Sequence, residues 1–185
     1  MKKSYFVAKK DMQTLSVDMD EVITDTAKKL KDYYCRDFGI TFNEEELEGK
    51  DLKQVVKPEH LSKFHEYLNS QGFFGDLEIM PNAEKVLKKL NEKYELFIVS
   101  AALEFPNSLL DKFNWISEHL PFISWKQICL CGTKSIIQTD IMIDDRTRNF
   151  SHFKGRKILY TCHHNILEKD YERVSNWKEI ESKLL

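Results

Sequence analysis

The stretch LSVDMDEVITD, residues 15–25, joins a short apolar run to a cluster of acidic side chains. Asp18, Asp20, Glu21 and Asp25 fall within eight residues, where like charges repel one another unless a positive group lies among them. The acids can form a solvated turn that caps a following helix, for which Asp25 alone is sufficient. Alternatively, they end a buried strand and hold a metal ion and a phosphate group.

Composition sets broad limits on the class of protein. The chain has 185 residues, of which 42% are hydrophobic, enough for one domain or for one domain with a modest insertion. Its net charge is only -2, which gives no sign of a nucleic-acid-binding surface. No apolar run approaches the roughly 18 residues of a membrane span, and the opening Met-Lys-Lys is not followed by the apolar segment of a signal peptide. We therefore expect neither a nucleic-acid polymer nor a membrane as partner.

The four cysteines are scattered along the sequence. Cys129 and Cys131 would share one face of a strand, but their spacing is not that of a zinc site and no second pair follows. The run Cys162-His163-His164 suggests metal ligands, but it has no matched partners, so that we expect a buried free thiol beside surface histidines instead. Free thiols of this kind favour a reducing, cytoplasmic setting.

Short apolar runs predict the strands of the fold. They are nearly continuous rather than alternating, as in a parallel sheet that is buried on both faces. The third and fourth runs are separated by only nine residues, so that any helix between them must be very short. The five predicted strands are residues 14–18, 96–100, 127–131, 141–144 and 157–161.

Helical periodicity lies between these runs. Three patterns repeat at i, i+3, i+4 and i+7 or at similar spacing, and Asn82 and Asn176 stand where N-caps are expected. We therefore predict an α/β fold with a doubly wound parallel sheet. The residues expected to face the core are Ala83, Val86, Leu87 and Leu90; Leu109, Leu110, Phe113 and Ile116; and Trp177, Ile180 and Leu184.

One interval is too long for a simple strand–helix–strand unit. The chain from Asp18 to Leu96 is more than twice the roughly 30 residues of such a unit, and its surplus contains helical patterns but no convincing strand. We expect residues 1–25 and 81–185 to form the core domain and residues 26–80 a helical cap. The cap would stand over the crevice where open α/β sheets bind ligands, with the aromatic turn Gly72-Phe73-Phe74-Gly75 at its exit.

Polar residues follow the predicted strands at one edge of the sheet. Asp18 and Asp20 follow the first strand, Ser100 ends the second, Lys134 comes after the third, and Asp144-Asp145 ends the fourth. Mg²⁺ prefers carboxylate oxygens, whereas a lysine and a serine can donate hydrogen bonds to a phosphoryl group. The carboxyl ends of parallel strands converge at one edge of the sheet, so Lys134 and a bound Mg²⁺ would supply positive charge beside the acids of residues 15–25.

These residues resemble the motifs of the haloacid dehalogenase superfamily of phosphotransferases. DMDEVITD has the form of its first motif, and Ser100, Lys134 and Ile143-Asp144-Asp145 lie where its second, third and fourth motifs should. The order of the four motifs is correct, and the resemblance covers nearly the whole chain. The Gly-Phe-Phe turn, the sequence TKSII before IDDR and the helical insertion are similar to those of the 5'(3')-deoxyribonucleotidases.

The resemblance implies a role for each matching residue. Asp18 would be the nucleophile that forms an aspartyl-phosphate, and Asp20 the general acid and base. Mg²⁺ would be held by Asp18, the main-chain carbonyl of Asp20, Asp144 and Asp145. The remaining assignments are phosphate binding by Ser100, Ala101 and the catalytic Lys134, and substrate binding by Phe73, Phe74 and Thr26.

The sequence departs from the resemblance in two respects. Glu21 stands where a glycine is common, which bears on loop geometry more than on chemistry. Thr26 stands where the mammalian nucleotidases place an aromatic residue, and Ala101-Ala102 stand where those enzymes are more polar, so the base preference is left open. The expected partner is a small phosphomonoester such as a nucleoside monophosphate, and a homodimer is compatible with the resemblance. The alternatives are a phosphatase for another small phosphomonoester and a catalytically silent binding protein.

Overall fold

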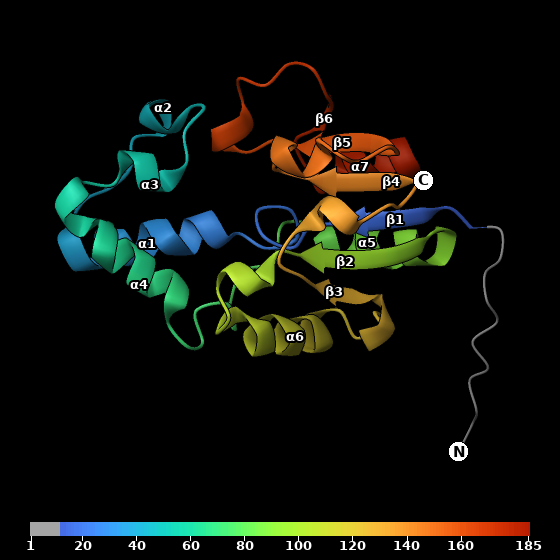
Figure 1. The fold of residues 1–185 in the computed structure, drawn as a ribbon, viewed down its shortest axis with the longest axis horizontal. Helices are drawn as coiled ribbons and strands as arrows, with labels where there is room; N and C mark the ends of the chain where they lie inside the picture. Colours follow the sequence, from blue (N-terminus) through green and yellow to red (C-terminus); the bar gives the residue numbers. More distant parts are fainter. Residues whose placement is uncertain (1–11) are drawn as a thin grey trace.

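The computed structural model describes residues 12–185, which form one parallel sheet with helices around it (Figure 1). The sheet has six strands in the order β3-β2-β1-β4-β5-β6, and every neighbouring pair is parallel. The expected absence of a signal peptide concerns residues that precede residue 12, outside the described residues. The strands are β1 (Thr14–Val17), β2 (Glu95–Ser100), β3 (Ile128–Leu130), β4 (Ile141–Asp144), β5 (Arg156–Tyr160) and β6 (Glu172–Val174).

The α/β fold and the five predicted strands are confirmed. β6 was not predicted, because three residues that include Glu172 and Arg173 give no apolar run. A short 3-10 helix, η4 (Lys134–Ile136), lies in the short connection between β3 and β4, as the spacing required.

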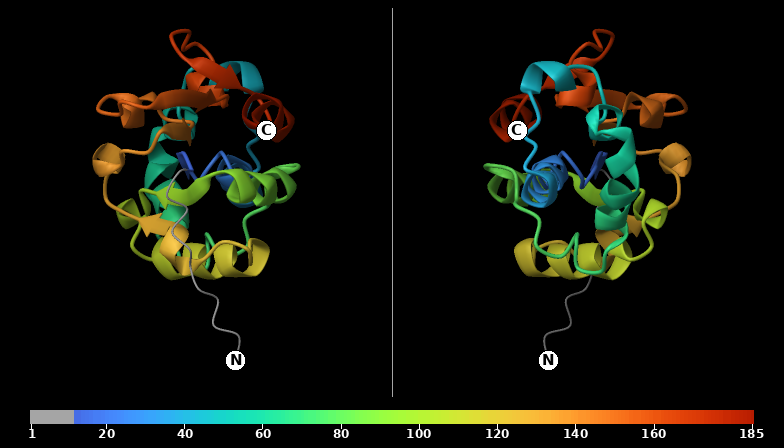
Figure 2. Two further views of the ribbon diagram at one scale, coloured as in Figure 1. Left: turned by 90° about the vertical axis from the view of Figure 1, so that its right-hand side faces the viewer. Right: turned by 90° about the vertical axis from the view of Figure 1, so that its left-hand side faces the viewer.

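Seven α-helices accompany the described strands. α5 and α7 lie beside one another on one side of the sheet (Figure 2), and their apolar residues join those of β1, β2 and β4 in the main core. A smaller cluster of Met142, Phe150, Phe153 and Leu159 occupies the opposite face of β4 and β5. The helices are α1 (Thr26–Phe38), α2 (Glu44–Leu47), α3 (Leu52–Val55), α4 (Leu61–Asn69), α5 (Ala83–Lys93), α6 (Ser108–His119) and α7 (Trp177–Leu184).

Helices α1 to α4 lie together beyond the carboxyl ends of the strands (Figure 1). They have a hydrophobic core of their own, which includes Leu30, Tyr34, Phe64, Tyr67 and Phe73. Because this cluster is distinct from the main core, we propose that residues 26–80 form a cap, as predicted from the sequence.

The buried face of α6 differs from the prediction. Leu110 is 65% exposed and Phe113 is 40% exposed, whereas Lys112 is 2% exposed and lies on the buried face with Trp115 and Ile116. The apolar pattern placed Ile116 correctly but Leu110 and Phe113 wrongly, because the buried position at Lys112 is taken by a charged residue that has a partner in the site described below.

The two predicted N-caps have different outcomes. Asn176 begins α7 as predicted, since its side chain accepts hydrogen bonds from the main-chain amides of Lys178 and Glu179. Asn82 is the N-cap residue of α5 as predicted, but it has a φ of 69° and its side chain makes no capping hydrogen bond. Asp25 caps α1 through the amide of Lys28, which leaves Asp18 and Asp20 unexplained by capping.

Within residues 12–185, no helix combines the length and apolar character needed to cross a membrane. All four cysteines are free thiols.

Candidate active site

The site begins where β1 and β4 end side by side. The amide of Asp18 donates to the carbonyl of Ile143 over 2.9 Å, which brings Asp18 next to the acidic pair that ends β4. Asp18, Asp144 and Asp145 each offer one carboxylate oxygen, and these oxygens lie within 4.8 Å of one another. All three residues are buried. Such a group of oxygen ligands suits a hard divalent cation.

Lys134 provides the positive charge beside these acids. Its Nζ lies 2.6 Å from Asp18 Oδ1 and 2.7 Å from Asp144 Oδ2. Thr133 caps the short helix η4, where Lys134 is the first residue, by accepting from the amide of Ser135. Burial acts to lower the pKa of Lys134, but the two carboxylates outweigh it and raise that pKa. Lys134 is therefore a cation at every working pH.

One lysine does not neutralise three buried carboxyl groups. Burial, with the charge of Asp144, raises the pKa of Asp145 to about 7. Burial is also the main cause that raises the pKa of Asp18, with smaller contributions from the charges of Asp144 and Asp145, and together these outweigh the opposing charge of Lys134. A divalent cation among these oxygens would favour their ionised forms.

Neighbouring side chains fix the two acids of β4. Asn149 donates from Nδ2 to both carboxylate oxygens of Asp144, at 2.9 and 3.0 Å. Asp145 is held on several sides, because Arg146 Nε lies 3.3 Å from Oδ2 and His164 Nε2 lies 3.2 Å from the same oxygen. Asn165 donates over 2.8 Å to the main-chain carbonyl of Asp145. These contacts thus fix the positions of the carboxyl groups of Asp144 and Asp145.

Asp20 is the centre of a second group of contacts. Its carboxylate accepts from Thr26 Oγ1 at 3.1 Å and from Ser100 Oγ at 3.3 Å, and it forms an ion pair with Lys112. Lys112 also donates to Ser100 Oγ over 3.0 Å. Burial acts to raise the pKa of Asp20, but the charge and hydrogen bond of Lys112 outweigh it and lower that pKa. Asp20 is therefore ionised in the free site.

The loop between Asp18 and α1 is shaped by two backbone features. The amide of Met19 donates to Asp18 Oδ1 over 2.7 Å, and Glu21 adopts a φ of 62°. A positive φ favours glycine, which explains why a glycine is common at this position in the family whose first motif this sequence resembles. Glu21 stabilises the turn here by accepting from the amide of Ala27 over 2.7 Å.

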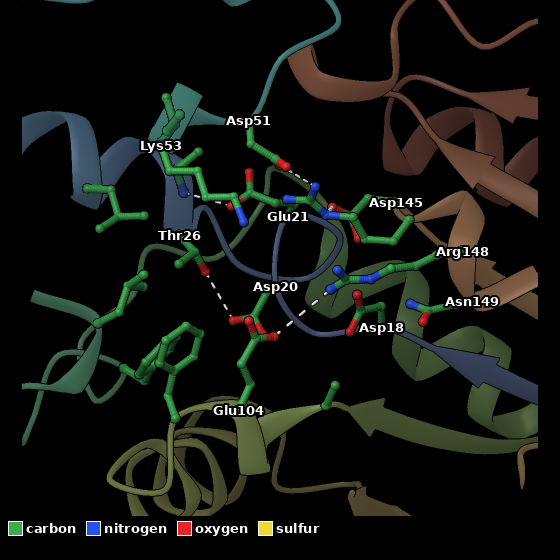
Figure 3. Close-up of a pocket in the computed structure, with 18 of the residues that line it drawn as sticks. Asp18, Asp20, Glu21, Thr26, Asp51, Lys53, Glu104, Asp145, Arg148 and Asn149 are labelled. Atoms are coloured by element: carbon green, nitrogen blue, oxygen red, sulfur yellow. Dashed lines mark hydrogen bonds and ion pairs between the residues drawn. The ribbon is translucent and has the colours of Figure 1, made fainter. Parts of the chain in front are cut away.

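A cavity of about 310 Å³ lies between this edge of the sheet and the cap (Figure 3). Asp18, Asp20, Lys134 and Asp145 form part of its polar end. Its apolar wall combines cap and core residues: Ala27, Leu30, Phe64, Leu68, Phe74 and Phe105. The rings of Phe74 and Phe105 stack with centroids 6.1 Å apart and an interplanar angle of 28°.

Most of the residues chosen from the sequence meet at this cavity, including Ala101 and Thr26. Ser100 is fully buried and contacts Asp20 and Lys112. It is not among the residues that line the cavity. Phe73 packs on Tyr33, Lys29 and Phe74 within the cap and is not among the residues that line the cavity. The roles assigned to these residues remain predictions.

Two interpretations of individual side chains need correction. His164 was expected at the surface, but its side chain is 6% exposed and contacts Asp145, because the loop after β5 lies against the end of β4. The lysine-rich segment Lys28-Lys29 predicts a solvated helix face, but Lys29 contacts the carbonyl and ring of Phe73, and its side chain is only 13% exposed.

Sequence reasoning missed several residues of the site. Lys112 was hidden inside an apolar pattern, and only its i+4 spacing from Ser108 and its i+3 spacing to Trp115 indicate the buried face. Asn149 and Asn165 give no signal in the sequence, because their partners lie on other loops. The same holds for Arg148 and Phe105, which line the cavity.

Comparison with known proteins agrees with this geometry. Residues 12–185 match the family model described as "5' nucleotidase, deoxy (Pyrimidine), cytosolic type C protein". The chain belongs to this nucleotidase family. Within it, the chain is 36% identical over 176 residues to the "5'(3')-deoxyribonucleotidase" of Bacillus subtilis, covering 94% of this chain and 99% of that protein. It is 39% identical over 175 residues to a Staphylococcus aureus protein named "Putative 5'(3')-deoxyribonucleotidase", covering 94% and 96% respectively.

Solved structures show the same fold at low sequence identity. A haloacid dehalogenase-like hydrolase from Streptococcus pneumoniae has a TM-score of 0.59 at 13% identity and covers 94% of this nucleotidase family member and 99% of its own chain. A haloacid dehalogenase-like protein from Agrobacterium tumefaciens has a TM-score of 0.60 at 13% identity, with coverage of 93% and 97%. The chain is thus a hydrolase of the nucleotidase family that has the fold of haloacid dehalogenase-like proteins, in agreement with the resemblance of its motifs.

Proposed function

We propose that the protein is a Mg²⁺-dependent phosphatase that hydrolyses (deoxy)ribonucleoside monophosphates through an aspartyl-phosphate on Asp18. The observation that carries this proposal is the convergence of Asp18, Asp144, Asp145 and Lys134 at the carboxyl ends of β1 and β4. The names of the relatives from Bacillus subtilis and Staphylococcus aureus support the substrate class. The free thiols and the absence of a membrane-spanning helix in residues 12–185 are compatible with the cytoplasmic location expected from the sequence.

The donor set fits a magnesium ion. Three buried carboxyl groups offer oxygens within 4.8 Å of one another, and burial together with the charge of Asp144 raises the pKa of Asp145 to about 7. Asp18, Asp144 and Asp145 would hold the ion, together with the main-chain carbonyl of Asp20. When bound, Mg²⁺ would neutralise phosphoryl charge and keep the carboxyl groups ionised.

In the first chemical step, a carboxylate oxygen of Asp18 attacks phosphorus. A new bond forms between that oxygen and phosphorus, the ester P–O bond breaks, and its electron pair leaves with the alkoxide. Lys134 donates to phosphoryl oxygens and stabilises their charge. Asp20 gives a proton to the leaving oxygen.

The lowered pKa of Asp20 places a condition on that step. Because the free site holds Asp20 as an anion, the carboxyl group must gain its proton when substrate binds. A phosphate monoester, whose second pKa is about 6, can bring this proton as its monoanion. In the second step Asp20 takes a proton from water, the water oxygen bonds to phosphorus, and the bond from Asp18 to phosphorus breaks.

The cavity supports a nucleoside as the remainder of the substrate. Its apolar wall contains Phe74 and Phe105, and a base stacked on an aromatic ring gains about 1–3 kcal/mol. Thr26 lines the same cavity, while its hydroxyl is engaged with Asp20.

A panel of phosphate monoesters tests the proposal. Purified protein should hydrolyse deoxynucleoside monophosphates in preference to sugar phosphates, and chelation of Mg²⁺ should abolish turnover. Equal rates with and without the metal, or faster turnover of sugar phosphates, would contradict it.

A further inference from the structure

Arg148 differs from most other cations that line the cavity. Lys112, Lys134 and Arg146 are at least two-thirds buried, and each lies close to one or more carboxylates of the site. The Arg148 side chain is 70% exposed, and its Nη2 lies 3.9 Å from Glu104 Oε2. This separation exceeds hydrogen-bond distance, so the guanidinium is only loosely engaged with Glu104.

The topology of the sheet places this pair over the reacting groups. Glu104 lies in η2 (Ala102–Glu104), which follows β2, and Arg148 lies in η5 (Thr147–Phe150), which follows β4. In the sheet, β1 lies between β2 and β4, and Asp18 follows its last residue. A side-chain bridge from the β2 loop to the β4 loop therefore spans the end of the strand that carries Asp18.

The cavity confirms that both side chains belong to this end of the site. Glu104 and Arg148 line it together with Asp18, Asp20 and Lys134. Figure 3 shows the Arg148 side chain extending into the pocket toward Glu104. The same two residues also line a neighbouring hollow beside Gly132 and Thr133, so Arg148 has open space on both sides.

A phosphoryl group is a stronger partner for Arg148 than Glu104 is. An exposed carboxylate at this distance binds a guanidinium weakly, because solvent screens the pair. A phosphate monoester presents several oxygens with up to two negative charges, and the planar guanidinium can donate two parallel hydrogen bonds to them. Binding of substrate would thus draw the arginine away from Glu104.

We propose that Arg148 is a substrate-binding residue that exchanges Glu104 for the phosphoryl oxygens of the substrate. In the free protein, Glu104 lies 3.9 Å from the guanidinium and competes weakly with the substrate for it. This inference rests on the proposed phosphatase function. It adds Arg148, which is not part of the sequence motifs, to the residues that bind the phosphoryl group of the substrate.

The test compares four proteins with the wild type in the presence of Mg²⁺. Arg148→Gln should raise the KM for a deoxynucleoside monophosphate and for p-nitrophenyl phosphate about 10- to 100-fold, and weaken binding of inorganic phosphate in calorimetry equally. Glu104→Gln should lower KM about two- to fivefold, because Arg148 loses its competing partner. The double variant should show no such gain. Arg156→Gln, which breaks an exposed ion pair with Glu172 at the opposite ends of the strands, is the matched control and should leave KM unchanged.

The outcomes separate this inference from the proposed function. A wild-type protein without phosphatase activity refutes the function itself. With an active wild type, an Arg148→Gln variant whose KM and phosphate affinity stay within twofold of the wild-type values overturns the role of Arg148. An equal gain from Glu104→Gln with and without Arg148 overturns the exchange, since Glu104 would then act by general repulsion of the substrate.

Discussion

Lys134 Nζ lies 2.6 Å from Asp18 Oδ1, which pairs the proposed nucleophile with a buried cation that comes from a different loop. The same ammonium contacts Asp144, so that one lysine joins the ends of β1 and β4. Removal of its charge leaves buried carboxyl groups without compensation, a change that affects both folding and chemistry.

Lys134→Met should therefore lower kcat for any phosphomonoester by about 100-fold or more, because the phosphoryl charge loses a fixed donor. In metal-free protein the same change should cost about 3–5 kcal/mol of unfolding free energy. Urea unfolding with and without Mg²⁺ measures the second effect. Unchanged stability in the metal-free state would contradict the ion-pair network described above.

Lys112 gives a second prediction, which concerns Asp20. In Lys112→Met the burial of Asp20 is no longer opposed by that charge, so the pKa of Asp20 should rise from its lowered value. We expect kcat to fall about 10- to 100-fold and the acidic limb of its pH profile to move to higher pH. Lys89→Met, which removes an exposed partner of Glu181, is a suitable control. A lower rate with an unmoved profile would mean that Lys112 only supports the fold.

Metal binding should change the pH dependence of stability. The pKa of Asp145 is about 7 in the metal-free fold, against about 3.9 in an unfolded chain. The folded state thus binds more protons between these values, and the stability from protonated Asp145 is complete below about pH 4 and is lost as the pH rises through 7. Mg²⁺ favours the ionised carboxyl groups, so it should raise Tm more at about pH 8 than at about pH 5. Asp145→Asn should reduce this difference; an equal shift in Tm at both pH values would contradict the proposed ligand set.

Substitutions of the two phenylalanines of the turn, Phe73 and Phe74, should have different effects on catalysis. Phe74 lines the cavity, whereas Phe73 packs against Tyr33 inside the cap. Phe74→Leu should weaken kcat/KM for a deoxynucleoside monophosphate by about 1–3 kcal/mol and affect p-nitrophenyl phosphate much less. Phe73→Leu should lower the stability of the cap and change both substrates alike. Equal losses for Phe74→Leu on both substrates would remove the support for base stacking.

The sequence predicted the parts of this site that depend on strand order. Asp18, Lys134 and Asp144 could be brought together in advance because the carboxyl ends of parallel strands converge. Lys112 could not be placed, since its burial depends on an ion pair with Asp20 that is distant in the sequence, and apolar periodicity chose Leu110 and Phe113 instead. For the same reason His164 was assigned to the surface, although a long-range contact with Asp145 buries it.

The most direct test of the central claim is to find the phosphate on the protein during turnover. Wild-type protein mixed with a deoxynucleoside monophosphate and Mg²⁺, quenched rapidly in acid and digested, should yield a phosphorylated peptide with the modification on Asp18. Asp18→Asn should give neither this peptide nor product, while it keeps the far-UV circular dichroism spectrum of the wild type. Turnover near the wild-type rate by Asp18→Asn, or a phosphate carried on a different residue, would contradict the account.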